Sequence, residues 1–162
     1  MVSLMDRIKI FCTITDSQFN SLNSTIKSQP ILDNPKILGS ITGNVVTAIL
    51  GRYNIVQVFL SDSMFDVTSK LEAETYQVQS LIQDRKWISE KHDCDNFSYS
   101  AMGYWSSCFE SFSFGIAWSK THAFNIMIDN EMQLWILEPQ KNEWFKYEDR
   151  PSTNYDVYLV LM

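Results

Sequence analysis

The stretch HAFNIMIDNEMQLWILE, residues 122–138, predicts the centre of the fold: two apolar strands joined by a tight turn. The turn is Asp129-Asn130-Glu131, and the strands cover residues 122–129 and 133–138. Counted from Asn130, His122 lies eight residues before the turn and Glu138 eight residues after it. We therefore expect His122 and Glu138 to be cross-strand neighbours within reach of a hydrogen bond.

A helix is expected before this hairpin, beginning at or just after Asp93-Cys94. Its buried face should carry Phe97, Ala101 and Trp105, which follow one another at a spacing of four residues. Strands over 112–118 and 156–162 should complete the sheet. The predicted fold class is α+β, papain-like, with the helix bearing the cysteine packed on an antiparallel sheet bearing the histidine and the acid.

The whole chain, 1–162, is expected to form a single domain with two zones. The first zone, 1–66, should hold a strand over 8–14, a short helix over about 17–26 and a hairpin of strands 45–50 and 53–60. The second zone, 67–162, is the catalytic-type core, and its first helix should run from a Ser69 cap to about residue 83. One face of that helix should carry the apolar side chains of Leu71, Val78, Leu81 and Ile82, with Thr75 beside them.

Composition limits the partners and the compartment. The net charge of −6 argues against nucleic acid and anionic membrane as partners, because both require basic patches. No apolar run approaches the roughly 20 residues that span a bilayer, and the N-terminus lacks a signal-peptide pattern. Three cysteines, an odd number, favour reduced thiols and a cytoplasmic location, whether in a cell's own protein or a viral protein in a host.

The candidate chemistry lies at Cys94. A helix N-terminus supplies positive potential and free N–H groups, which lower the pKa of a thiol and can hold an oxyanion. The flanking Asp93 and Asp95 oppose this by disfavouring the thiolate. An incidental thiol is the plainer interpretation, and it is the one adopted for Cys12 and Cys108.

His122 and Glu138 are the natural partners of a reactive thiol. A carboxylate that accepts a hydrogen bond from an imidazole fixes its tautomer and stabilises the charged ring. Either residue alone would be interpreted as an ordinary surface or core side chain. The acidic residues Asp93 and Asp95 are candidate calcium ligands, although solvated turn carboxylates are the commoner case. No other cofactor is expected.

Three motifs in fixed order resemble a set of small papain-like cysteine proteins found in phages and bacteria. They are Asp-Cys-Asp-x-Phe from Asp93, His-Ala-x-Asn from His122 and Trp-x-x-Glu-Pro-Gln from Trp135. The pattern, within residues 93–145, is also similar to the C-terminal protease-like domain of a fungal agglutinin. The resemblance implies Cys94 as nucleophile, His122 as general base and acid, and Glu138 as the orienting carboxylate. Because the agglutinin-like relatives depend on calcium, it also implies a metal site near Cys94.

One position departs from the papain-like pattern. A glutamine usually stands six residues before the cysteine and completes the oxyanion hole, whereas this chain has Ile88 there. Gln140 or backbone N–H groups could serve instead, and Gln140 is also the alternative orienting residue. If neither group completes the oxyanion hole, the domain has lost catalysis and kept the fold.

Two functions follow from these patterns. The first is a papain-like cysteine hydrolase, a thiol protease, that cleaves a peptide or isopeptide bond of a protein or peptide substrate through an acyl-enzyme. The alternative is a non-catalytic papain-like-fold binding module, a phage or bacterial accessory protein, that recognises a protein partner. Exposed aromatic side chains at Trp144, Phe145 and Tyr147 would suit the alternative.

Overall fold

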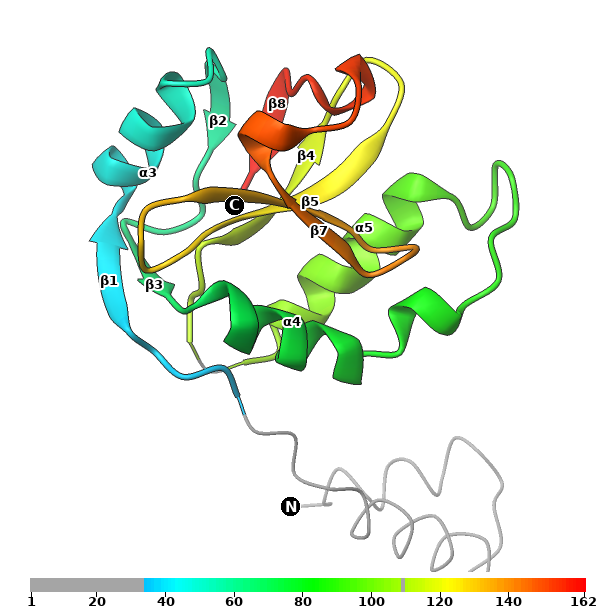
Figure 1. Ribbon diagram of the computed structural model, residues 1–162, viewed down its shortest axis with the longest axis horizontal. Coiled ribbons are helices and arrows are strands. Elements are labelled where there is room, and N and C mark those ends of the chain that lie inside the picture. The colour runs from blue at the N-terminus through cyan, green and yellow to red at the C-terminus, as the bar shows by residue number, and fades with distance from the viewer. Residues whose placement is uncertain (1–33, 109) are drawn as a thin grey trace, which may run out of the picture. The chain divides into compact units, whose positions relative to one another are not determined.

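The computed structural model describes residues 34–108 and 110–162 and is built around a six-stranded sheet (Figure 1). Along the sheet the order is β2 (Gln57–Phe59), β8 (Leu159–Leu161), β4 (Phe114–Trp118), β5 (Ala123–Ile128), β6 (Leu134–Glu138) and β7 (Glu143–Lys146). β2 runs parallel to β8, and every other neighbouring pair is antiparallel. A separate antiparallel pair joins β1 (Gly39–Thr42) to β3 (Met64–Val67).

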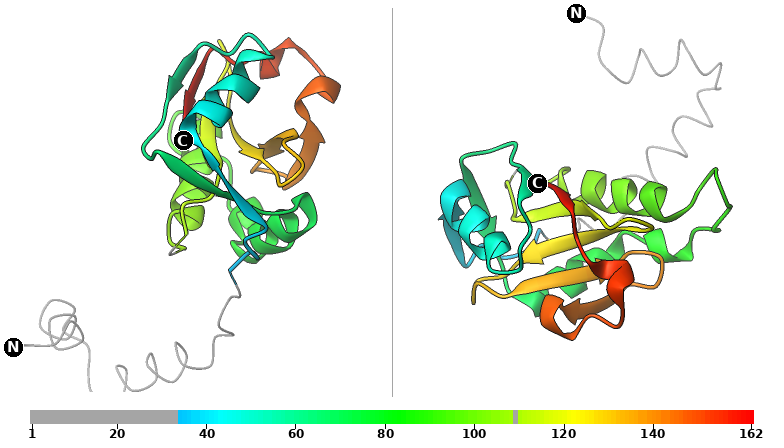
Figure 2. Two further views of the ribbon diagram at one scale, coloured as in Figure 1. Left: turned by 90° about the vertical axis from the view of Figure 1, so that its left-hand side faces the viewer. Right: turned by 90° about the horizontal axis from the view of Figure 1, so that it is seen from above.

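Helices cover both faces of the sheet, as the two turned views show (Figure 2). The described part of the chain contains α3 (Gly43–Gly51), α4 (Lys70–Gln79) and α5 (Cys94–Trp105). It also holds short 3₁₀ turns at Ile82–Asp84, Tyr147–Asp149 and Thr153–Tyr155. The fold class is α+β, as predicted.

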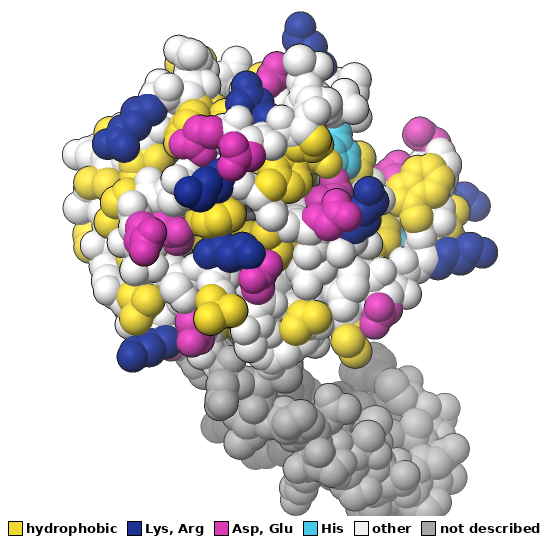
Figure 3. Space-filling model, viewed as in Figure 1, with side chains coloured by type: hydrophobic (Ala, Val, Ile, Leu, Met, Phe, Trp, Pro, Cys, Tyr) yellow, Lys and Arg dark blue, Asp and Glu magenta, His cyan; other side chains and the backbone are white. Residues whose placement is uncertain are grey.

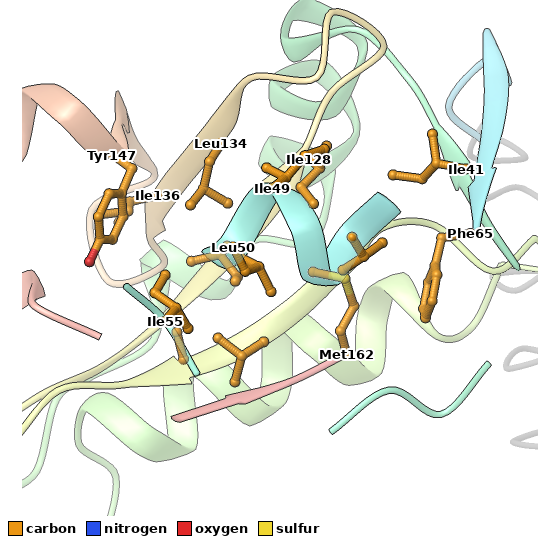
Figure 4. Packing of buried hydrophobic residues seen from close by; sticks show 14 of the residues in the cluster. Ile41, Ile49, Leu50, Ile55, Phe65, Ile128, Leu134, Ile136, Tyr147 and Met162 are labelled. Atoms are coloured by element: carbon orange, nitrogen blue, oxygen red, sulfur yellow. The ribbon is translucent and has the colours of Figure 1, made fainter. Parts of the chain in front are cut away.

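The apolar core has two parts, one on each face of the sheet. On one face, Ile49 and Leu50 of α3 pack with Ile128 of β5 and Ile136 of β6 (Figure 4). On the other face, α4 and α5 pack over Met127 and its neighbours. All six residues of β5 are buried, because this central strand is covered on both sides.

The helix that carries Cys94 agrees with the prediction. α5 begins at Cys94, and Phe97, Ala101 and Trp105 are buried. The indole of Trp105 stacks on Phe114 of β4 with ring centroids 4.5 Å apart. The spacing of four residues was sufficient to predict these buried positions, because α5 buries a single face.

The hairpin of residues 122–138 is also confirmed, as β5 and β6 pair in the antiparallel sense. β7 was not predicted, because its sequence Glu-Trp-Phe-Lys has charged ends and lies directly after Pro139 and a turn. The sheet itself is mixed rather than antiparallel throughout, since β8 pairs with β2 in the parallel sense.

The predicted hairpin of residues 45–50 and 53–60 is wrong. Residues 43–51 form α3, and only Gln57–Phe59 is a strand. The β-branched run at Val45-Val46-Thr47 favours a strand by propensity. The helix forms instead because Thr42 caps it, accepting a hydrogen bond from the backbone N–H of Val45, and its apolar residues are buried in the core.

The first helix of the second zone was predicted with the wrong face and the wrong end. Ser69 caps α4 as expected, accepting from the backbone N–H of Glu72 at 3.2 Å. The buried side is Ala73, Tyr76 and Gln77. The helix stops at Gln79 because Leu81 adopts a left-handed conformation with φ of 53°. Of the predicted face only Ile82 is buried; Leu71, Thr75, Val78 and Leu81 are exposed.

The aromatic residues after β6 do not form an exposed surface. Tyr147 is only 3% exposed. Phe145 packs against the core on the α3 face, and Trp144 packs against the core on the α5 face. The prediction of an exposed aromatic surface at these three residues is therefore wrong.

The remaining predictions for the first zone fall on other parts of the chain. The strand over 8–14, the helix over about 17–26 and Cys12 lie outside the described residues. The single-domain organisation of 1–162 and the cytoplasmic location stay predictions. In the part of the chain that the structure describes, none of the helices has the length and apolar character needed to cross a bilayer.

Candidate functional site

A His122–Glu138 pair lies at one end of the central strands. His122 directly precedes β5, where its backbone N–H donates to Ser119 Oγ at 3.0 Å. Glu138 is the last residue of β6 and is 5% exposed. His122 Nε2 lies 2.6 Å from Glu138 Oε2. The cross-strand contact expected from the hairpin count is thus present, in the geometry by which a carboxylate fixes an imidazole tautomer.

A tyrosine from the C-terminal region completes this polar cluster. The hydroxyl of Tyr155, in the turn Thr153–Tyr155, donates to Glu138 Oε2 at 3.1 Å. Its ring meets the His122 ring edge-on, with centroids 5.4 Å apart. Burial raises the pKa of Tyr155, and the neighbouring Glu138 charge raises it further. The phenol therefore stays protonated and remains a hydrogen-bond donor to the carboxylate.

The cluster forms one wall of an open pocket of about 420 Å³. Glu138 Oε1 is buried and has no hydrogen-bond partner among the described residues. A buried acceptor without a partner costs about 1–3 kcal/mol, so this oxygen is a ready acceptor for a ligand donor. The pocket lining consists of Thr121, His122, Glu138, Gln140, Lys141, Asn154 and Tyr155.

Cys94 is the first residue of α5 and is half-buried. It is not part of the pocket lining, and its thiol forms no hydrogen bond within the described residues. The helix is fastened to the sheet near this end, because Asn125 Nδ2 of β5 donates to the carbonyl of Ser98 at 3.0 Å. An approach of the Cys94 thiol to His122 stays a prediction, as do the roles expected for these residues. Ile88 lies in the loop before α5 and is 43% exposed.

The acidic residues beside Cys94 interact with each other. A hydrogen bond with Asp93 raises the pKa of Asp95, and burial adds to the shift. The Asp93 carboxylate also accepts from the backbone N–H of Glu90 at 3.1 Å. Within residues 34–108 and 110–162, no group of three or more His, Cys, Asp or Glu side chains could hold a metal ion. The calcium site stays a prediction.

Sequence reasoning found three residues of the pocket, His122, Glu138 and Gln140, and missed the others. Tyr155 lies seventeen residues beyond Glu138 and reaches it only through the fold of the C-terminal segment. A local pattern could not have indicated that contact. Thr121 and Lys141 are direct neighbours of motif residues, and their position could have suggested them.

The comparisons with known proteins establish a fold but no family. No family model matches the chain, and no curated protein matches its sequence. A solved structure described as the PSL1a–E64 complex is similar, with a TM-score of 0.61 and 22% identity over 76% of this chain and 51% of that one. A Polyporus squamosus lectin bound to the human-type influenza-binding epitope Neu5Aca2-6Galb1-4GlcNAc is similar with a TM-score of 0.57. It shares 22% identity over 76% of this chain and 49% of its own.

These structures correct the interpretation drawn from the three motifs. One of these structures is a lectin bound to a glycan, and neither description names a protease, so the assignment to papain-like cysteine proteases is corrected. The predicted hydrolase function and its peptide or isopeptide substrate are corrected for the same reason. At 22% identity the likeness shows the fold alone, and this chain spans about half the length of the chains it resembles.

Proposed function

We propose that this chain is a non-catalytic binding module whose His122–Glu138 pocket holds one sugar residue of a glycan. The observation that carries the proposal is the buried Glu138 Oε1, which has no hydrogen-bond partner among the described residues. The other carboxylate oxygen, Glu138 Oε2, is already held by His122 and Tyr155. A sugar hydroxyl is the simplest donor for such an acceptor. A hydrogen bond to a charged group contributes about 1.5–3 kcal/mol.

The remaining lining suits a hydroxyl-rich ligand. Gln140 and Asn154 supply amide groups that both donate and accept, which matches the dual character of a hydroxyl. Tyr155 adds an aromatic ring, an amphipathic surface that suits the partly apolar faces of a sugar. The pocket is open and polar, unlike the mostly apolar cavities that enclose drug-like ligands.

The structural neighbours and the surface favour a glycan over the protein partner of the alternative reading. The Polyporus squamosus lectin is bound to a three-sugar epitope, although its similarity covers about half of its length. Of the aromatic residues expected to contact a protein, Tyr147 is buried, and Trp144 and Phe145 are partly buried against the two cores. The visible face carries acidic and basic side chains interspersed with apolar ones, with no large patch of one kind (Figure 3).

The proposal is tested by titrating ¹⁵N-labelled protein with Neu5Aca2-6Galb1-4GlcNAc and following amide shifts by NMR. We expect shifts confined to the amides around Thr121, Lys141 and Asn154. Glu138→Gln keeps the shape and removes the charge, so affinity should fall about ten- to hundredfold. Gln140→Ala should weaken binding without touching the His122–Glu138 pair. The matched control is Glu131→Gln, an exposed carboxylate outside the pocket.

A parallel titration uses E64, the compound named with the first neighbour. Glycan shifts that persist unchanged in both pocket variants would overturn the proposed site. An absence of any shift with the trisaccharide and with its Galb1-4GlcNAc fragment would overturn the ligand class. A mass increase on Cys94 after incubation with E64 would show a reactive thiol and overturn the non-catalytic assignment.

A further inference from the structure

A second cavity, of about 330 Å³, lies beside the C-terminal half of α5 and shares no residue with the His122 pocket. Its inner wall is apolar and largely buried: Phe65, Phe112, Phe114 and Trp105 are each at most 7% exposed. The Trp105 ring is stacked on Phe114 and meets Phe112 edge-on, so these rings form a fixed surface. The wall of the cavity is therefore formed before any ligand enters.

The mouth of the cavity is acidic. Asp62 Oδ2 accepts hydrogen bonds from Ser61 Oγ at 3.1 Å and Ser111 Oγ at 2.8 Å, which holds the carboxylate in position. Glu110 Oε2 accepts from Asn34 Nδ2 at 3.0 Å. The second oxygen of each carboxylate has no hydrogen bond to a described residue. No lysine or arginine is among the described residues that line the cavity, so both negative charges lack a basic partner there.

We infer that this cavity binds an organic cation, a primary ammonium group on an apolar stem. The stem would lie against the aromatic wall, and the ammonium would bridge the free oxygens of Asp62 and Glu110. An ammonium group carries three donors and no acceptor, which matches a mouth of carboxylate and hydroxyl acceptors. A neutral ligand would gain the apolar contacts but not the charge-assisted hydrogen bonds. The same chemistry occurs in a free alkylamine and in a lysine side chain.

This inference is independent of glycan binding, because the two pockets have different linings. The test compares n-hexylammonium with hexan-1-ol by NMR titration of the full chain. The charged probe should bind at least tenfold more tightly and shift the amides of Ser61, Ser106 and Ser111. The double variant Asp62→Asn/Glu110→Gln should lose that preference, whereas Glu131→Gln should retain it. High salt should weaken the charged probe only.

Equal binding of the amine and the alcohol would overturn the inference, as would unchanged amine affinity in the double variant. N-acetyl-lysine amide then separates the two sources of the cation. Binding as tight as that of n-hexylammonium would assign the cavity to a lysine side chain of a peptide. Binding at least tenfold weaker would assign it to a free amine. A glycan-binding result, positive or negative, changes none of these outcomes.

Discussion

Asn125 connects the two elements on which the candidate site depends. It is fully buried in β5, and its amide nitrogen donates to the carbonyls of Ser98 in α5 and Gly115 in β4, at 3.0 and 3.1 Å. The Asn125 side chain thus fastens the first turns of α5 to the sheet, four residues from Cys94. Its Oδ1 has no partner among the described residues, which makes the site intolerant of a further loss of hydrogen bonds.

We predict that Asn125→Asp destabilises the protein by several kcal/mol. The change replaces two donated hydrogen bonds with a buried carboxylate that faces two carbonyl oxygens, and an uncompensated buried charge costs about 3–5 kcal/mol. Urea unfolding measures the loss. The control is Asn44→Asp in the first turn of α3, where an acid favours the helix dipole and stability should be unchanged or slightly higher. Equal effects of the two variants would contradict the role given to Asn125.

The residue contacts that could be predicted from the sequence are the local ones. His122 and Glu138 were paired correctly because a short hairpin fixes which residues face each other. Tyr155 was not found, because its contact with Glu138 depends on the path of the segment after β7. The role of the pocket was also misjudged, since a motif of cysteine, histidine and acid does not by itself identify the function.

Among the elements, the contact between β4 and β8 tolerates no side chain at Gly115. A β-carbon added there would stand 2.4 Å from the carbonyl oxygen of Leu161 and 3.0 Å from the Met162 α-carbon. Both neighbours are backbone atoms, which cannot rotate away. The close approach of β8 to β4 therefore depends on the absence of a side chain at a single glycine of β4.

Gly115→Ala should destabilise the protein by about 1–3 kcal/mol, as overpacking of a tight site does. Gly103→Ala is the matched control, because nothing lies within 4 Å of its added carbon and alanine favours the α5 helix. Thermal unfolding of both variants measures the effect. A Gly115→Ala protein as stable as the parent would mean that β8 lies farther from β4.

The buried face of a helix was predicted correctly where the spacing of apolar residues and the tertiary contacts agree. α5 buries the face that its spacing indicates, whereas α4 buries Ala73 and Gln77 and exposes Leu71 and Val78. The reason is that Gln77 has a specific partner: its Oε1 accepts from the Trp105 indole N–H at 2.8 Å. A hydropathy pattern does not reveal a buried polar pair of this kind. Because of this pair, α4 turns a different face toward the core from the one expected.

Four buried or partly buried tyrosines make the stability of the protein sensitive to alkali. Burial and the hydrogen bond to Glu148 raise the pKa of Tyr53 to about 12 from a usual value of 10. Burial also raises the pKa of Tyr76, Tyr104 and Tyr155. The unfolded chain would release these protons from about pH 10, whereas the folded protein retains them.

We therefore predict that the free energy of unfolding falls as pH rises above about 10, the Tyr53 contribution being lost by about pH 12. The sign follows because the folded state binds more protons than the unfolded state in this range. Urea unfolding at pH 9, 10 and 11 measures the slope, which Tyr53→Phe should make shallower. The prediction fails if the parent protein is equally stable at pH 9 and pH 11.

The arrangement of β8 has a consequence for how the chain folds. This strand lies between β2 and β4, yet its parallel partner β2 precedes it by about a hundred residues. During synthesis, β2 has no neighbour in this sheet until residues 159–161 leave the ribosome. The central hairpin can form early, whereas the β2 edge of the sheet can close only after β8 has been made. A nascent chain stalled before residue 159 would thus present an unpaired β2 to chaperones.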